Sequence, residues 1–322
     1  MSQRNRLLVI LTSVILLGGA LVVTGPFVHA PGRADTLRAG FDAEFISRRD
    51  GYPGLCAHYG FTFHEDPCQM APGLMYNAVA NGSVDVIDAF ATDGRIEVFD
   101  LVILEDDRHF FPPYHAAPLV RGVTLKKYPE LSRVLNRLSD VISDEAMRTL
   151  NRDVDENGAK PRDTARRFLV ERNLLDADNL PDEDHAGVVR IGSKPFTEQE
   201  ILGEMMALLI ESHTWLQVER RLNLGGTMLC FNALSSGDID LYPEYTGTGL
   251  VNILKRRANP DPNESYRIAK RAFAERFDLI WLKPFGFNNT YTLTMRREHA
   301  RRLGVQTISE LAQYLTEQDQ LK

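Results

Sequence analysis

Cysteine is scarce in this chain, with three residues among 322. The sequence has no CxxC motif and no Cys/His pair with zinc-ligand spacing, which excludes a disulfide-rich scaffold and a structural zinc site. It also lacks any run of six like charges, and its formal net charge is −7. A nucleic-acid-binding surface needs clustered Lys and Arg. We therefore expect no nucleic acid among the partners.

The common catalytic motifs are missing as well. The sequence contains no GxSxG, SxxK, HExxH, GxxxxGK or GxGxxG motif, and its histidines form no i, i+4 pair. The cluster Glu105-Asp106-Asp107-Arg108-His109 resembles an acid–base or metal group on paper. Adjacent side chains do not converge on one ion, so we interpret it as a solvated turn. The prediction is a protein that is not an enzyme and that holds no cofactor and no metal.

The three cysteines have two expected fates. Cys56 and Cys68 lie among loop-forming residues and can form a disulfide in an oxidising compartment. Cys230 lies within a helical apolar pattern and is interpreted as a small buried hydrophobe.

The N-terminus has the pattern of an export signal. Arg4 and Arg6 precede an apolar run, 7–23, which small residues follow. The segment 1–34 is therefore predicted to be a cleaved signal peptide or, since the run is just long enough to span a bilayer, an uncleaved anchor. Both alternatives place the rest of the chain in the periplasm or on the outer face of the cytoplasmic membrane.

The rest of the chain alternates short apolar strands with amphipathic helices. This pattern predicts an α/β fold with largely parallel sheets. Residues 176–187 (DADNLPDEDHAG) are acidic and lack apolar periodicity, so we interpret them as a linker between 35–175 and 188–322. The expected elements include a strand and loop over 36–45, a helix over 73–80, strands over 84–90 and 101–104, a helix over 131–138, a helical stretch over 150–175 broken near 158 and 161, a strand over 188–191, a helix over 198–210, and strands over 218–224 and 239–241.

A weak internal repeat occurs at an offset of 155 residues. Each copy predicts a helix end, a Gly cap, a strand and an aromatic residue at the carboxyl end of that strand. Ligands of open α/β sheets bind at this edge, so two copies predict two similar lobes that each offer an aromatic side chain. The matching positions are Asn77-Ala78 and Asn232-Ala233, Gly82 and Gly237, Asp85 and Asp240, and Phe90 and Tyr245.

Aromatic residues combined with small polar residues follow three predicted strands, in the segments 110–114, 242–249 and 287–291. Aromatic faces attract diffuse cations, and recognition of quaternary ammonium groups is their best-known use. Gly225-Gly226-Thr227 opens a predicted helix after a strand. Its N–H groups either bind an anion or form a tight turn with Thr227 as the N-cap.

Several of these segments resemble the substrate-binding proteins of ABC importers for glycine betaine, choline, carnitine and related quaternary amines. The matching segments are 191–199 (IGSKPFTEQ), 222–227 (LNLGGT), 238–249, 287–291, 41–54 (FDAEFISRRDGYPG), 92–96 (TDGRI) and 104–114 (LEDDRHFFPPY). In that family the Gly-Ser-Lys segment comes first, whereas here the second half (35–175) precedes the first half (188–322). The resemblance implies a circular permutant or, alternatively, a slice of a longer tandem or fused protein.

The resemblance also implies a fold and partners. The family fold is α/β, a two-lobed periplasmic-binding-protein fold of type II with hinge strands, here expected in permuted order. One lobe comprises 118–175 and 188–291, and the other 36–117 and 292–322. The implied partners are a small quaternary-amine ligand and the permease subunits of an ABC transporter, and we expect a monomer.

The resemblance assigns an ammonium cage. Tyr114, Tyr245 and Tyr291 match the family's cage tyrosines, which surround a trimethylammonium group. Phe90 stands where the family usually has a fourth tyrosine, so it keeps an aromatic face and lacks the hydroxyl.

The resemblance also assigns polar contacts. Lys194, Arg48 and Thr248 match positions that hold a ligand carboxylate, and Asn289 matches a polar position at the rim of the cage. Charge-assisted bonds favour a zwitterion such as glycine betaine. The alternatives are a choline or carnitine binder, or a membrane-anchored sensor that uses the same domain without transport.

Overall fold

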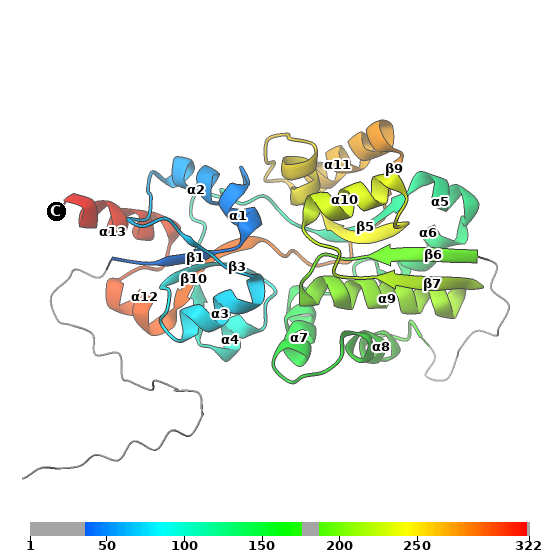
Figure 1. Cartoon of the computed structure of the whole chain (residues 1–322), viewed down its shortest axis with the longest axis horizontal. Helices are drawn as coiled ribbons and strands as arrows, with labels where there is room; N and C mark the ends of the chain where they lie inside the picture. Colours follow the sequence, from blue (N-terminus) through cyan, green and yellow to red (C-terminus); the bar gives the residue numbers. More distant parts are fainter. Residues whose placement is uncertain (1–35, 176–186, 321–322) are drawn as a thin grey trace, which may run out of the picture. The chain divides into compact units, whose positions relative to one another are not determined.

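The chain folds around two separate five-stranded sheets (Figure 1). The computed structural model describes residues 36–175 and 187–320. The strand orders are β2-β1-β3-β10-β4 in one sheet and β7-β6-β8-β5-β9 in the other. The predicted α/β class is therefore confirmed. The predicted signal or anchor segment and residues 176–186 of the predicted linker lie outside the described residues.

We call the first sheet and its helices lobe 1. Its strands are β1 (Ala39–Phe41), β2 (Cys68–Gln69), β3 (Val86–Phe90), β4 (Leu101–Ile103) and β10 (Tyr291–Arg296). Its helices are α1 (Ala43–Ser47), α2 (Tyr52–Tyr59), α3 (Pro72–Ala80), α4 (Arg95–Val98), α12 (Arg297–Leu303) and α13 (Ile308–Gln320).

The second sheet and its helices form lobe 2. Its strands are β5 (Ala116–Arg121), β6 (Gly187–Gly192), β7 (Leu216–Arg221), β8 (Leu241–Tyr245) and β9 (Leu279–Trp281). Its helices are α5 (Gly122–Lys127), α6 (Glu130–Leu135), the 3₁₀ helix η1 (Asn136–Leu138), α7 (Asp144–Asp155), α8 (Pro161–Glu171), α9 (Thr197–His213), α10 (Thr227–Ser236), the π-helical η2 (Thr248–Ile253) and α11 (Pro262–Phe277).

Both sheets are mixed, so the expectation of largely parallel sheets is only partly correct. Strand β10 runs antiparallel to β3 and β4, and strand β5 runs antiparallel to β8 and β9. The other described pairs are parallel. Helical crossovers return the chain in the same direction. Strands β5 and β10 instead arrive from the other lobe through extended segments, and they enter their sheets in the opposite direction.

Local signals account for several element boundaries. The predicted break near Gly158 and Pro161 is confirmed, because α7 ends at Asp155, Gly158 has φ +69° and Pro161 begins α8. The prediction of a strand and loop over 36–45 is wrong at its end, where a helix begins. Residues 43–47 form α1, since the Asp42 side chain accepts a 2.7 Å hydrogen bond from the Glu44 N–H and caps the helix.

The internal repeat corresponds to a repeated arrangement in space. Asp85 precedes β3 and accepts a 3.0 Å hydrogen bond from the Arg38 N–H. In lobe 2, Asp240 precedes β8 and accepts a 2.9 Å bond from the Arg190 N–H. Each aspartate also donates its own N–H at 2.7 Å to the carbonyl of the same arginine. Phe90 and Tyr245, the last residues of β3 and β8, therefore occupy equivalent positions in the two lobes.

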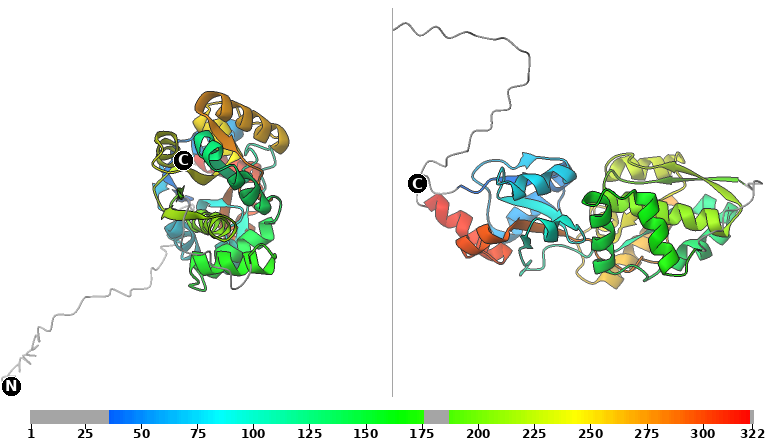
Figure 2. Two further views of the ribbon diagram at one scale, coloured as in Figure 1. Left: turned by 90° about the vertical axis from the view of Figure 1, so that its right-hand side faces the viewer. Right: turned by 90° about the horizontal axis from the view of Figure 1, so that it is seen from below.

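Two segments, 104–115 and 282–290, connect the lobes (Figure 2). They lie side by side, because His115 and Asn288 form an isolated antiparallel bridge. The Tyr114 N–H also donates to Asn288 Oδ1 at 2.6 Å, and the Asn289 N–H donates to the Tyr114 carbonyl at 3.2 Å.

The three cysteines, all within the described ranges, are free thiols. Cys56 lies half-buried on α2, where the Tyr52 hydroxyl bonds to its sulfur, and Cys68 is exposed on β2. The structure therefore lacks the Cys56–Cys68 disulfide that the sequence permits. Cys230 is fully buried, as expected. Across the described residues, no helix is long and apolar enough to cross a membrane.

Candidate functional site

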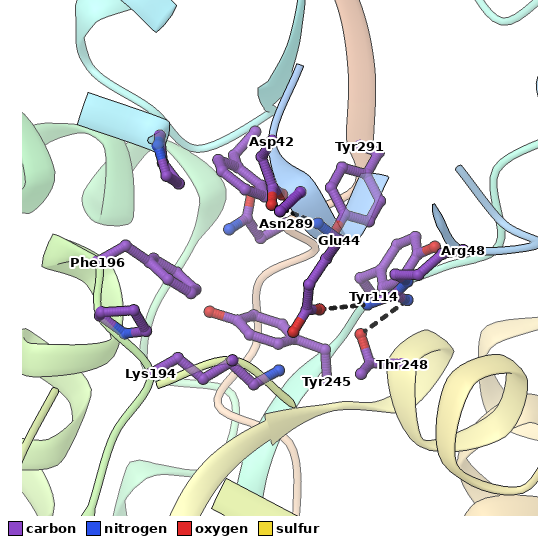
Figure 3. A pocket seen from close by; sticks show the side chains of 15 residues that line it. Asp42, Glu44, Arg48, Tyr114, Lys194, Phe196, Tyr245, Thr248, Asn289 and Tyr291 are labelled. Carbon is purple, nitrogen blue, oxygen red and sulfur yellow. Dashed lines mark hydrogen bonds and ion pairs between the residues drawn. The ribbon is translucent and has the colours of Figure 1, made fainter. Parts of the chain in front are cut away.

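A pocket of about 240 Å³ lies where the two lobes meet the segments 104–115 and 282–290 that connect them (Figure 3). We call it the inner pocket. All eight residues that the resemblance assigns to a ligand line it: Arg48, Phe90, Tyr114, Lys194, Tyr245, Thr248, Asn289 and Tyr291. The other lining residues are Asp42, Ala43, Glu44, Pro72, Pro195, Phe196 and Gly226.

Five aromatic rings surround the inner pocket, one more than the sequence analysis assigned. Phe196 stacks on Phe90 with ring centroids 5.6 Å apart and an interplanar angle of 4°. Its ring also lies 6.4 Å from that of Tyr245. On the other side, the Tyr291 ring lies 5.4 Å from Phe90 and 5.5 Å from Tyr114. Phe196 belongs to the matched segment 191–199, so that segment already contained the signal for it.

The aromatic positions follow from the strands. Phe90 ends β3 and pairs in register with Tyr291, the first residue of β10. Tyr245 ends β8 opposite Ala116 of β5. The sequence analysis placed 242–245 after a strand, whereas these residues form β8 itself. The strand is longer than predicted because it pairs with both β6 and β5.

Arg48 is buried and fully engaged by other protein groups. Its Nε and Nη2 donate to the two Asp50 carboxylate oxygens at 2.9 and 2.5 Å. Its Nη2 also donates to Thr248 Oγ1 of lobe 2, and its Nη1 to Glu44 Oε2, both at 3.2 Å. The guanidinium carbon lies 5.4 Å from the centroid of the Tyr291 ring. Arg48 thus links the lobes, and its charge is already compensated.

Lys194 also has a protein carboxylate as its partner. Its Nζ donates to Glu244 Oε1 at 2.6 Å and lies 5.2 Å from the centroid of the Tyr245 ring. Glu244 is 0% exposed and also accepts bonds from the Tyr242 hydroxyl at 2.8 Å and the Tyr245 N–H at 2.7 Å. The sequence analysis missed Glu244, which lies 50 residues from Lys194 along the chain.

Glu44 contributes an anion at the start of α10. Its carboxylate accepts bonds from the Thr227 N–H at 2.5 Å and the Thr227 hydroxyl at 2.9 Å. Burial raises the pKa of Glu44, but the Lys194 ammonium, the Thr227 N–H and Arg48 together bring it below its usual value. The glycine-rich start of α10 therefore does bind an anion, and that anion is the Glu44 carboxylate of the protein itself. The N-cap residue is Gly226, which corrects the alternative of a Thr227 N-cap.

Glu198, on α9, joins four donors around its buried carboxylate. The Tyr245 hydroxyl and Asn289 Nδ2 donate to Oε1 at 2.7 and 2.8 Å. The Thr92 hydroxyl and Asn151 Nδ2 donate to Oε2 at 2.5 and 3.3 Å. Burial raises the pKa of Glu198, although these bonds oppose the shift. Glu198 thereby holds one aromatic and one polar residue of the pocket in place.

Carboxyl groups outnumber cations at the inner pocket. Among the described residues, the lining holds two cations, Arg48 and Lys194, and two carboxyl groups, Asp42 and Glu44. Four more carboxyl groups bond directly to lining residues: Asp50, Asp88, Glu198 and Glu244. The electrostatic character of the pocket therefore favours a positively charged ligand group.

Asp42 and Asp88 form a buried acidic pair beside the pocket. Asp88 Oδ1 accepts a 2.8 Å bond from the Asp42 N–H, whereas Asp88 Oδ2 has no partner among the described residues. Burial raises the pKa of Asp88 well above its usual value, and the Asp42 carboxyl raises it further. Burial also raises the pKa of Asp42. The folded chain thus binds protons at this pair more tightly than the unfolded chain does.

Replacing Asp88 by asparagine is expected to stabilise the protein at neutral and alkaline pH. A raised folded pKa means that stability falls as pH rises above the ordinary Asp value, and Asp88→Asn removes this loss. We expect the free energy of unfolding to rise by about 1 kcal/mol near pH 8 and to change little near pH 4. Urea unfolding at pH 4 and at pH 8 measures this change in free energy. The control is Asp100→Asn, which breaks an exposed ion pair with Arg297. An equal effect at both pH values would contradict the prediction.

Two other candidate sites from the sequence have structural roles. Asp106 accepts hydrogen bonds from the backbone N–H groups of Phe110 and Phe111 at 2.9 and 2.8 Å, so the acidic cluster is a turn, as interpreted. The Cys230 thiol donates to the Ser193 and Gly225 carbonyls, and burial raises its pKa to about 12. No group of three potential metal ligands occurs within 36–175 and 187–320.

The sequence is similar to those of several known proteins. The chain is 39% identical over 145 residues to a carnitine transport binding protein of Listeria monocytogenes, covering 44% of this chain and 46% of that one. It is 38% identical over 136 residues to a glycine-betaine-binding protein of Pseudomonas aeruginosa, covering 42% and 44%. A solved structure titled glycine betaine/carnitine/choline ABC transporter is 36% identical over 42% of this chain and 50% of that chain, with a TM-score of 0.34.

The chain spans about half the length of the curated relatives it matches. A family model described as the substrate binding domain of ABC-type glycine betaine transport systems matches residues 29–171 and 187–321, most of the sequence. The chain therefore belongs to this family of substrate-binding domains.

Proposed function

We propose that this chain is the extracytoplasmic binding protein of an ABC importer and captures a small quaternary amine in the inner pocket. The observation that carries the proposal is the combination of five aromatic rings with an excess of carboxyl groups around one pocket. Aromatic faces and carboxylates both attract a diffuse cation that forms no directed hydrogen bonds. The relatives named for carnitine and glycine betaine support the same ligand class.

In this proposal, Phe90, Tyr114, Tyr245 and Tyr291 form the ammonium cage, together with Phe196. Arg48, Lys194, Thr248 and Asn289 form its polar side. The cage draws on both lobes, since Phe90 ends β3 of lobe 1 and Tyr245 ends β8 of lobe 2. A ligand that contacts both lobes stabilises the form in which the lobes are closed over it, with the two connecting segments as the hinge. Closure is the change that permease subunits recognise. The ligand leaves chemically unchanged.

We also propose that the two halves of the family domain occur in permuted order. The order rests on the resemblance, in which segment 191–199 opens the family domain and segment 41–54 belongs to its second half. The family model matches two separate stretches on either side of the predicted linker. The predicted linker lies between α8 and β6 along the chain, and both of these elements belong to lobe 2. It therefore connects two elements of the same lobe. Compact domains tolerate permutation where the original termini lie close together.

The proposed cage is tested by removing one aromatic face. Phe90 has no hydroxyl to lose, so Phe90→Leu keeps an apolar side chain and removes only the ring. We expect the dissociation constant for choline or glycine betaine to rise about twofold to thirtyfold, as a cation–π contact contributes about 0.5–2 kcal/mol. Isothermal titration calorimetry measures the change.

A neutral ligand serves as the control. 3,3-Dimethylbutanol has the shape of choline with carbon in place of the charged nitrogen, so it is expected to bind far more weakly to the unmodified protein. A quaternary amine at a hundred times its dissociation constant is expected to stabilise the chain by about 2.7 kcal/mol. Absence of any shift in thermal unfolding with glycine betaine, choline, carnitine or proline betaine would overturn the proposed function.

A further inference from the structure

A second cavity adjoins the inner pocket. It has a volume of about 490 Å³ and shares Glu44, Arg48 and Gly226 with the inner pocket. Its other lining residues are Ser47, Arg49, Met228, Leu229, Val251, Asn252 and Lys255. We call this cavity the outer chamber. It lies between α1 of lobe 1 and α10 and η2 of lobe 2.

The outer chamber has the opposite electrostatic character from the inner pocket. It contains three cations, Arg48, Arg49 and Lys255, and one carboxylate, Glu44. Among the described residues, the Arg49 guanidinium has no hydrogen-bond or ion-pair partner. The Lys255 ammonium has only a neutral one, the Asn252 side-chain oxygen at 3.2 Å. Both therefore differ from Arg48 and Lys194, whose charges buried carboxylates compensate.

Glu44 lies on the boundary between the two cavities. In the view of Figure 3 it lies beside Arg48 and Thr248, away from Phe196. Its pKa is lowered, so it is charged at neutral pH and repels a ligand carboxylate placed inside the cage. A carboxylate in the outer chamber also meets Glu44, but there Arg49 and Lys255 offset this repulsion.

We propose that the outer chamber is a subsite for the carboxylate end of an extended zwitterion, with Arg49 and Lys255 as its binding residues. This inference rests on the proposed function, because the ammonium end occupies the cage. The favoured ligand class is a trimethylammonium group that carries a carboxylate at the end of an extended carbon chain.

The test compares two probes that differ only in the tail. 4-(Trimethylammonio)butyrate carries the carboxylate, and butyltrimethylammonium lacks it. In the unmodified full chain at low salt, the zwitterion is expected to bind about fivefold to tenfold more tightly. Exposed ion pairs contribute modestly, so Arg49→Gln and Lys255→Gln are each expected to reduce this ratio about twofold to fivefold. Molar salt is expected to reduce it too.

A matched control comes from the same basic loop. Arg257 is exposed and lines neither cavity, so Arg257→Gln removes one charge and is expected to leave the ratio of affinities unchanged. Thermal unfolding without ligand establishes that each variant is folded. A ratio near one in the unmodified protein, or a ratio unaffected by the combined Arg49→Gln and Lys255→Gln variant, would overturn the subsite. If neither these probes nor choline binds, the proposed function fails as well.

Discussion

Replacing Lys194 by methionine is expected to lower the free energy of unfolding by about 3–5 kcal/mol, the cost of leaving a buried charge without its partner. The charge left behind is Glu244, which is fully buried and bonded to Lys194 at 2.6 Å. The Tyr242 hydroxyl and the Tyr245 N–H remain as donors but bring no positive charge. Urea or thermal unfolding without ligand measures the effect.

Two further variants separate this effect from a general loss of packing. Adding Glu244→Gln to Lys194→Met removes the stranded charge and is expected to restore most of the lost stability. Lys126→Met breaks an ion pair with Asp278 whose partners are 74% and 50% exposed, and we expect a loss of at most about 1 kcal/mol. If the double variant were as unstable as Lys194→Met, Glu244 would not be the cause.

The same double variant tests the role that the resemblance assigns to Lys194. If Lys194 binds a ligand carboxylate, a stable protein without it loses affinity for zwitterions and keeps affinity for choline. If Lys194 serves mainly to neutralise Glu244, both affinities change together. Titration calorimetry with glycine betaine and choline distinguishes these outcomes.

Replacing Glu198 by alanine is expected to be nearly as damaging. Four side-chain donors converge on its carboxylate, including Tyr245 and Asn289 of the inner pocket. Each buried donor left unsatisfied costs about 1–3 kcal/mol, and the four are not additive. We therefore expect the free energy of unfolding to fall by about 3 kcal/mol. The affinity for a quaternary amine is expected to fall at least tenfold, because Tyr245 and Asn289 lose their orientation.

Two controls accompany this prediction. Glu198→Gln keeps an acceptor for the Tyr245 and Asn289 donors, so it is expected to retain most of the affinity lost in Glu198→Ala. Glu200→Ala, two residues along α9, tests the effect of removing a partly exposed glutamate from the same helix. Affinity in Glu198→Ala equal to that of the unmodified chain would show that the cage does not depend on this carboxylate.

The sequence was most informative where functional residues lie in continuous motifs. Tyr245 and Thr248 belong to one matched segment, and Asn289 and Tyr291 to another, and all four line the inner pocket. The residues that sequence reasoning missed, Glu44, Glu198 and Glu244, also lie in matched segments, but their role is to bond other residues of the site. Glu44 bonds to Thr227 across 183 residues, and Glu198 bonds to Thr92 across 106. Nothing in the local sequence at Glu44 or Glu198 indicates its distant partner.

By itself, the sequence determined the α/β class, most of the helices and strands, and eight of the residues that line the pocket. Hydrophobic period, caps and motifs act over a few residues, so they are readable along the chain. Only the tertiary structure decided which charges meet. Lys194 reaches Glu244 because β6 and β8 are adjacent, and Glu44 reaches α10 because the two lobes meet at the pocket. Electrostatic compensation depends on distance in space and on burial, and the chain acquires both only when it folds.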